Sequence, residues 1–221
     1  MTEKGGPPKF KFQPLPRLAQ ISAIFGLAFT SIDGDAYPEL YVVQNFFGPQ
    51  RETGRMDGGV SLLLNNNKGQ FSPIWPDKSH LLVSGDAKAL TISDLNNDGL
   101  PDFHVSVNAG RAMAFEANPE QTNADQFLCL QLKGSEGNID AFGARVSLRG
   151  ESMPTFTQQV SSGGGYLSQS SPRLFFPVSS LKGDALEALE VLVHWPSGKQ
   201  STTKVRDLKK RDGRYWIDVS P

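Results

Sequence analysis

Residues 93–102, Ser-Asp-Leu-Asn-Asn-Asp-Gly-Leu-Pro-Asp, place oxygen-bearing side chains at alternate positions and a glycine after the third of them. Alternate residues of a tight loop can face its inside together, and Gly99 permits the sharp turn that a side chain would resist. Calcium takes about 6–8 oxygen ligands from carboxylates, amide and backbone carbonyls, and water. The stretch therefore predicts a calcium-binding loop. The expected ligands are the side chains of Asp94, Asn96, Asp98 and Asp102 and the backbone carbonyl of Leu100.

Two other interpretations of this loop stay open from the sequence. Magnesium demands a small octahedron and keeps several waters, so the larger set of oxygens favours calcium. Aspartate, asparagine and glycine favour turns by themselves, so an Asx-rich turn without metal is the alternative. The metal is favoured because all the spacings fit one coordination scheme.

An imperfect copy of the loop lies 63 residues earlier and pairs Asp33 with Asn96 and Glu39 with Asp102. Both copies run from β-prone residues through the acidic loop into a strand, and a repeat of this length with several strands is typical of propeller blades. Serine replaces the first carboxylate of the earlier copy and Ala36 replaces the glycine, so it is expected to be a weaker metal site. Its expected ligands are Ser31, Asp33, Asp35, Tyr37 and Glu39.

The rest of the chain has the pattern of an all-β protein. Short β-rich runs alternate with turn signals, and helical periodicity is almost absent. A hairpin turn is expected at residues 65–69, and Asp212-Gly213 predicts a hairpin between residues 204–208 and 215–219. One short helix is expected within residues 181–189. The expected strands include residues 40–43, 60–64, 103–107, 127–132, 144–148 and 189–195.

Composition limits the classes of partner. The 221 residues are 38% hydrophobic and 20% charged, with a formal net charge of −1, so a packed core is expected. The balanced charge does not suggest a nucleic-acid or membrane-surface partner, and no apolar run is long enough to span a membrane. Cys129 is the single cysteine, so no internal disulfide forms, and it is expected to pack as a small hydrophobe.

The acidic loops, the strand at residues 103–107 and the turn at residues 65–71 resemble the FG-GAP/VCBS repeat family. That resemblance implies β-propeller blades with calcium bound between the first two strands of a blade. The second half resembles the ASPIC/UnbV domain through three ordered motifs, at residues 139–146, 160–174 and 189–199. The combination is the layout of proteins similar to cartilage acidic protein and its bacterial relatives.

These resemblances imply two FG-GAP/VCBS-type blades in residues 10–118, a link near residues 117–124, and a β-sandwich-like ASPIC/UnbV domain in residues 125–219. Two blades do not close a ring, so open blade edges are expected, and homo-oligomers could cover them. Residues 1–8 lack the apolar core of a signal peptide. We expect a C-terminal piece of a longer protein in an extracellular or periplasmic setting, where calcium is plentiful.

The second half offers two ambiguous features. Gly163–Gly165 predicts a β-bulge or corner; Tyr166, Gln169 and Arg173 would then either line a shallow polar site or, for the tyrosine, cap the core. Residues 199–214 hold seven lysines and arginines against two aspartates. A solvated edge hairpin guarded by lysines is favoured over a patch for anionic glycans or an acidic protein face.

The expected function is that of a calcium-stabilised, non-catalytic module for binding or adhesion, with a protein or glycan partner. Catalysis finds little support, because the three histidines lie in no hydrolase or metalloprotease motif, and a carboxylate that binds calcium is a poor general acid. Two alternatives remain, an enzyme or accessory protein of the kind labelled enediyne biosynthesis, and a purely structural fragment that oligomerises.

Overall fold

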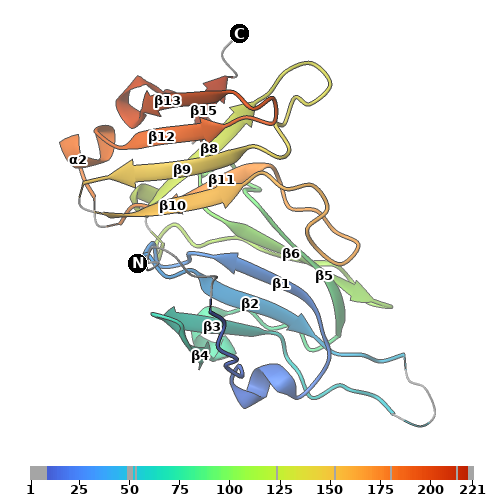
Figure 1. The fold of residues 1–221 in the computed structure, drawn as a ribbon. Helices are drawn as coiled ribbons and strands as arrows, with labels where there is room; N and C mark the ends of the chain where they lie inside the picture. Colours follow the sequence, from blue (N-terminus) through green and yellow to red (C-terminus); the bar gives the residue numbers. More distant parts are fainter. Residues whose placement is uncertain are drawn as a thin grey trace.

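The computed structural model describes residues 9–48, 52, 54–122, 124–151, 153–179, 181–212 and 214–218. Strands dominate it and form four separate sheets, two from each half of the chain (Figure 1). The predicted all-β class is therefore confirmed. None of the helices in the described part of the chain is long and apolar enough to cross a membrane.

The N-terminal half forms two antiparallel meanders of the blade type. The first has the order β1-β2-β3-β4 and the second the order β5-β6-β7. Each acidic loop joins the first two strands of its meander. The strands are β1 (Ile24–Thr30), β2 (Glu39–Gln44), β3 (Leu62–Asn67), β4 (Gln70–Ile74), β5 (Asp86–Ser93), β6 (Asp102–Asn108) and β7 (Met113–Phe115), with the short helices η1 (Arg17–Gln20) and α1 (Pro76–Ser79).

These two sheets share a core because one glycine lets them approach closely. A Cβ atom on Gly26 of β1 would lie 2.9 Å from the Cβ atom of Leu90 on β5. The rings of Tyr41 and Phe103 pack between the sheets with their centroids 5.0 Å apart. All six residues of β2 are buried, as expected for a strand that is covered on both faces.

The C-terminal half is a sandwich of two four-stranded sheets, in the orders β10-β9-β12-β13 and β11-β8-β15-β14. Leu130, Val146, Phe176 and Trp195 belong to the single core between them. The strands are β8 (Phe127–Lys133), β9 (Arg145–Gly150), β10 (Met153–Gln159), β11 (Arg173–Pro177), β12 (Glu190–His194), β13 (Gln200–Lys204), β14 (Lys209–Arg211) and β15 (Arg214–Asp218), with the short helices η2 (Ala124–Gln126), α2 (Asp184–Glu187) and η3 (Val205–Asp207).

Local predictions succeeded unevenly. The turn at residues 65–69 joins β3 to β4, and α2 lies within residues 181–189. The prediction of a strand at residues 204–208 was wrong. Residues 205–207 form η3, because Val205 is buried in the core and its N–H donates to the Leu189 carbonyl. The strand starts only at Lys209, and Gly213 of the predicted turn lies outside the described residues.

The basic stretch behaves as an edge strand. β14 lies at the edge of its sheet, and Lys209, Lys210 and Arg211 are all exposed. Exposed lysines on an edge strand oppose pairing with another chain. The interpretation as a guarded edge therefore accounts for this segment.

Cys129 is expected to resist alkylation in the folded protein. The side chain is buried on β8 opposite Phe175, and burial raises the pKa of its thiol to about 12. Only the thiolate reacts, so iodoacetamide near neutral pH should modify Cys129 only after unfolding. Intact mass after labelling with and without denaturant measures this, and full labelling of the native protein would contradict the burial.

Candidate metal centre

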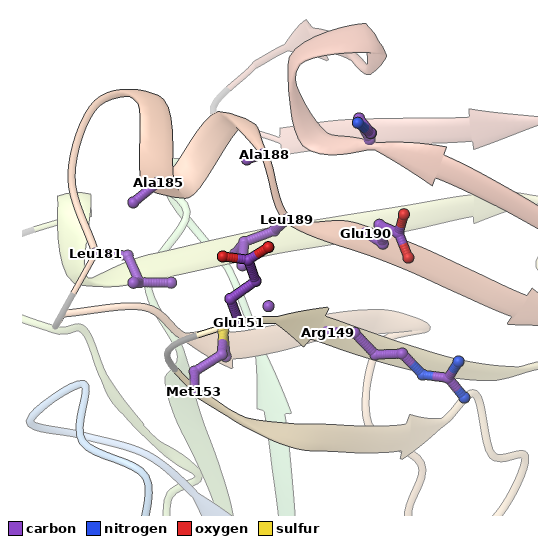
Figure 2. A pocket seen from close by; sticks show the side chains of 10 residues that line it. Arg149, Glu151, Met153, Leu181, Ala185, Ala188, Leu189 and Glu190 are labelled. Atoms are coloured by element: carbon purple, nitrogen blue, oxygen red, sulfur yellow. The ribbon is translucent and has the colours of Figure 1, made fainter.

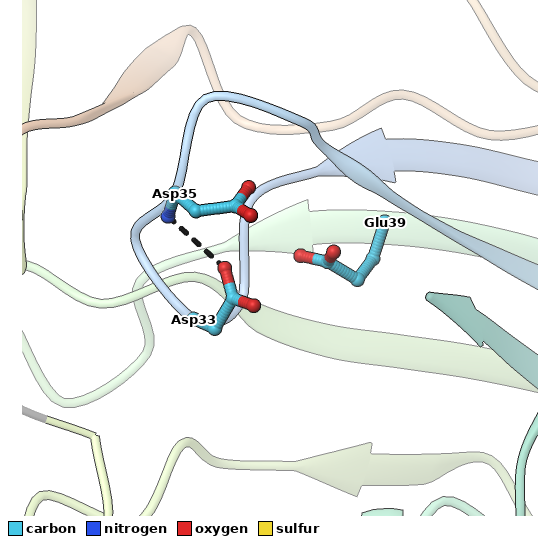
Figure 3. Close-up of side chains that lie close together, drawn as sticks. All are labelled: Asp33, Asp35 and Glu39. Atoms are coloured by element: carbon cyan, nitrogen blue, oxygen red, sulfur yellow. Dashed lines mark hydrogen bonds between the residues drawn. The ribbon is translucent and has the colours of Figure 1, made fainter. Parts of the chain in front are cut away.

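The first acidic loop, between β1 and β2, gathers three carboxylates. One carboxylate oxygen from each of Asp33, Asp35 and Glu39 lies within 4.8 Å of the others, and no other metal-type group of three His, Cys, Asp or Glu side chains occurs among the described residues. Figure 3 shows the three side chains converging on the space inside the loop. Such a set of hard oxygen atoms suits calcium.

Short side-chain-to-backbone hydrogen bonds fold this loop. The Asp35 N–H donates to Asp33 Oδ1 over 3.0 Å, and the Tyr37 N–H donates to Asp35 Oδ1 over 2.6 Å. The Gly34 N–H donates to the Ser31 hydroxyl over 3.0 Å. These contacts are Asx and Ser turns, which aspartate and serine make readily. The local sequence therefore favours this loop conformation.

Glu39 carries the clearest sign of a missing partner. Its side chain is only 2% exposed, and its Oε2 atom accepts the Ile32 N–H over 2.9 Å. Its Oε1 atom has no hydrogen-bond partner. Burial, reinforced by the charges of Asp33 and Asp35, raises the pKa of this carboxyl to about 7. A cation bound between the three carboxylates would satisfy this oxygen and offset the cost of burying it, so the residues fit a calcium ion.

The second acidic loop, between β5 and β6, has the same local design. The Leu95 N–H donates to Asp102 Oδ2, as the Ile32 N–H does to Glu39. The Asp98 N–H donates to Asn96 Oδ1 over 3.0 Å, and the Leu100 N–H donates to Asp98 Oδ1 over 2.8 Å. The internal repeat seen in the sequence is thus repeated in three-dimensional hydrogen bonding.

The carboxylates of the second loop are nevertheless tied to other groups. Asp94 Oδ2 lies 3.0 Å from Arg173 Nη1, although Asp94 Oδ1 keeps no partner. Both oxygens of Asp102 accept backbone N–H groups, from Leu95 and Ala117. The Asn96 amide donates to Asp98 Oδ2 over 2.9 Å. The sequence favoured this loop over the first one, whereas the structure gathers carboxylates only at the first; the ranking of the two loops stays a prediction.

Sequence reasoning missed the role of Arg173. It grouped Arg173 with Tyr166 and Gln169 in a shallow polar site, but the structure gives each a different partner. The Tyr166 ring packs edge-on against Phe25 at 5.4 Å, and Gln169 accepts a hydrogen bond from Ser162. No local signal pairs an arginine with an aspartate 79 residues away.

The segment that precedes Arg173 covers an open blade edge. The Ile92 N–H of β5 donates to the Ser170 hydroxyl over 3.0 Å, and the Ser171 N–H donates to the Ile92 carbonyl over 2.9 Å. Ser168 donates to the Leu90 carbonyl over 3.3 Å. Figure 1 shows this β10–β11 connection reaching from the C-terminal sandwich to the N-terminal sheets. An edge that the sequence left open is therefore covered by the chain itself.

A separate pocket of about 500 Å³ lies in the C-terminal domain between α2 and the strands β9 and β10 (Figure 2). Leu181, Met153 and Leu189 give it an apolar floor. Its charged lining is balanced between two cations and two anions, Arg149, Lys204, Glu151 and Glu190. It shares no residue with the acidic loops.

Comparison with known families assigns both halves of the chain. Residues 32–105 match the model of the FG-GAP-like repeat, and residues 134–211 match the model named ASPIC and UnbV. No curated protein matches the chain. The first match contains most of the first acidic loop and all of the second, and the other contains Arg173. The chain thus combines an FG-GAP-like repeat region with an ASPIC and UnbV domain, as its motifs predicted.

Proposed function

We propose that this chain is a calcium-stabilised, non-catalytic module that binds a protein or glycan partner in an extracellular or periplasmic setting. The observation that carries the calcium part is the buried, unpartnered Glu39 Oε1 atom beside Asp33 and Asp35. The FG-GAP-like match supports a propeller-type binding module.

Calcium would be held by Asp33, Asp35 and Glu39, with the Ser31 hydroxyl and the Tyr37 carbonyl completing the set. When bound, the ion supplies positive charge for three clustered carboxylates and links the ends of β1 and β2. No described lysine or arginine forms an ion pair with these carboxylates. The folded state therefore gains stability from calcium by mass action, since the unfolded chain has no such site.

The test compares thermal unfolding in excess chelator and in about 10 mM calcium. A site with a dissociation constant of about 10⁻⁴–10⁻³ M, usual for extracellular modules, adds about 1.4–2.7 kcal/mol at that concentration. The double variant Asp33→Asn/Asp35→Asn should lose this gain.

The matched control is Asp77→Asn/Asp207→Asn, which removes two exposed carboxylates outside both loops and should keep the gain. An unfolding midpoint of the wild type that calcium leaves unchanged would rule out the proposal.

A further inference from the structure

The two acidic loops both touch the C-terminal domain at equivalent positions. In the first loop, Ser179 donates to the Gly34 carbonyl over 2.6 Å. In the second loop, Asn97 stands where the first has Gly34, and its Oδ1 atom accepts from Arg173 over 3.1 Å and from Arg214 over 2.9 Å. The loops are therefore the joint between the two domains.

The two loops differ in how their negative charge is matched. Each holds three carboxylates, but among the described residues only the second loop is contacted by cations of the other domain. Arg173 places Nη1 3.0 Å from Asp94 Oδ2 and 2.5 Å from the Asp94 carbonyl oxygen. The Asp94 side chain is fully buried and that of Arg173 is 16% exposed, so water screens this pair little.

Strand geometry fixes both arginines. Arg173 is the first residue of β11, where it pairs with Gln131 of β8, and Arg214 is the first residue of β15 in the same sheet. A guanidinium group has five N–H donors in a rigid fork, which lets Arg173 reach both Asp94 and Asn97 at once. Asn97 presents its amide from a left-handed backbone with φ of 63°, a conformation that asparagine tolerates.

We propose that Arg173, assisted by Arg214, is the resident cation of the second acidic loop, which therefore locks the two domains together instead of binding calcium. The guanidinium group neutralises Asp94, and its positive charge disfavours a divalent ion beside the same carboxylate. The bare Asp94 Oδ1 atom is then a ligand that calcium reaches only once Arg173 is removed. Among the described residues, no arginine forms an ion pair with the first loop, and this proposal does not depend on whether that loop binds calcium.

The experiment measures calcium binding by isothermal titration calorimetry of the full chain in the Asp33→Asn/Asp35→Asn background, which silences the first loop. We expect no binding while Arg173 is present, and one ion per chain after adding Arg173→Gln. The control Arg149→Gln removes an exposed arginine of β9 that lines the separate pocket of the C-terminal domain, and this variant should bind no calcium. Calcium binding in the background with Arg173 intact would overturn the proposal, as would its absence after Arg173→Gln in a folded protein.

Thermal unfolding gives a second readout. Arg173→Gln should lower the midpoint in chelator, and calcium should restore it, whereas Arg149→Gln should do neither. If Arg173→Gln does not fold, Arg173→Lys replaces it in the experiment. Lysine keeps the positive charge but lacks the forked guanidinium group, so the second loop should bind calcium detectably but weakly. A folded Arg173→Lys variant that binds no calcium would contradict the proposal. If the first loop does not bind calcium, the wild type will show no calcium binding, which distinguishes failure of the proposed function from failure of this inference.

Discussion

Replacing Gly34 with alanine is expected to lower the free energy of unfolding by about 3 kcal/mol and to weaken calcium binding at the first loop. Gly34 has φ of +78°, which costs a residue with a side chain about 1–2 kcal/mol. The new Cβ atom would also lie 2.8 Å from the Cβ atom of Gln126 and 3.1 Å from that of Ser179, so it pushes against the C-terminal domain. Overpacking of this kind costs a further 1–3 kcal/mol, roughly.

Gly137→Ala separates these two effects in urea unfolding. Gly137 has a similar φ of +86°, but its added Cβ atom would meet nothing within 4 Å. This control should lose only the backbone part, about 1–2 kcal/mol. Equal losses in the two variants would mean that the domains do not press on the first loop.

Local features of this fold follow from the sequence because they depend on residues close together in it. The spacing of Asp33 and Asp35 makes the Asx turns, and the same spacing at Asn96 and Asp98 repeats them. β-prone runs bounded by turn residues predicted most of the strands. The family motifs gave the composition of both halves, which the family matches confirm.

The loop conformation accepts two of the substitutions that made the first loop the weaker expected metal site, and that expectation itself stays a prediction. Ser31 lacks a carboxylate, but its hydroxyl accepts the Gly34 N–H and helps close the turn. Ala36 does not adopt a positive φ, whereas Gly99 in the second loop has φ of 87°, so alanine carries no strain there. Sequence spacing could not show which positions of the two copies need glycine.

The contacts between the two domains could not be predicted from the sequence for a different reason. Ser170 meets Ile92 across 78 residues, and Arg173 meets Asp94 across 79. No sequence pattern near Asp94 indicates that a guanidinium group will neutralise it. Ser168, Ser170 and Ser171 likewise look like a loop, yet they hydrogen-bond to the edge of β5 and so cover it.

Glu39 should make the calcium-free protein less stable as the pH rises. Its pKa is raised from 4.5 to about 7 in the folded state, so the folded protein binds this proton more tightly than the unfolded chain does. The resulting stability is fully present below about pH 4.5 and is lost as the pH rises through 7. In chelator, the free energy of unfolding of the wild type should therefore fall by roughly 2–3 kcal/mol between about pH 5 and pH 8, relative to that of Glu39→Gln. The glutamine variant has no titrating carboxyl at this position.

Calcium should reverse this trend, because the ion needs the ionised carboxylate and supplies the partner that Glu39 Oε1 lacks. Its affinity for the wild type should rise between about pH 5 and pH 8 and level off above the pKa of Glu39. Denaturant unfolding of wild type and Glu39→Gln at each pH, with chelator and with calcium, measures both effects. Parallel stability curves for the two proteins in chelator would show that Glu39 is ionised at no cost. The cluster at Asp33, Asp35 and Glu39 would then be an acidic turn that does not need an ion.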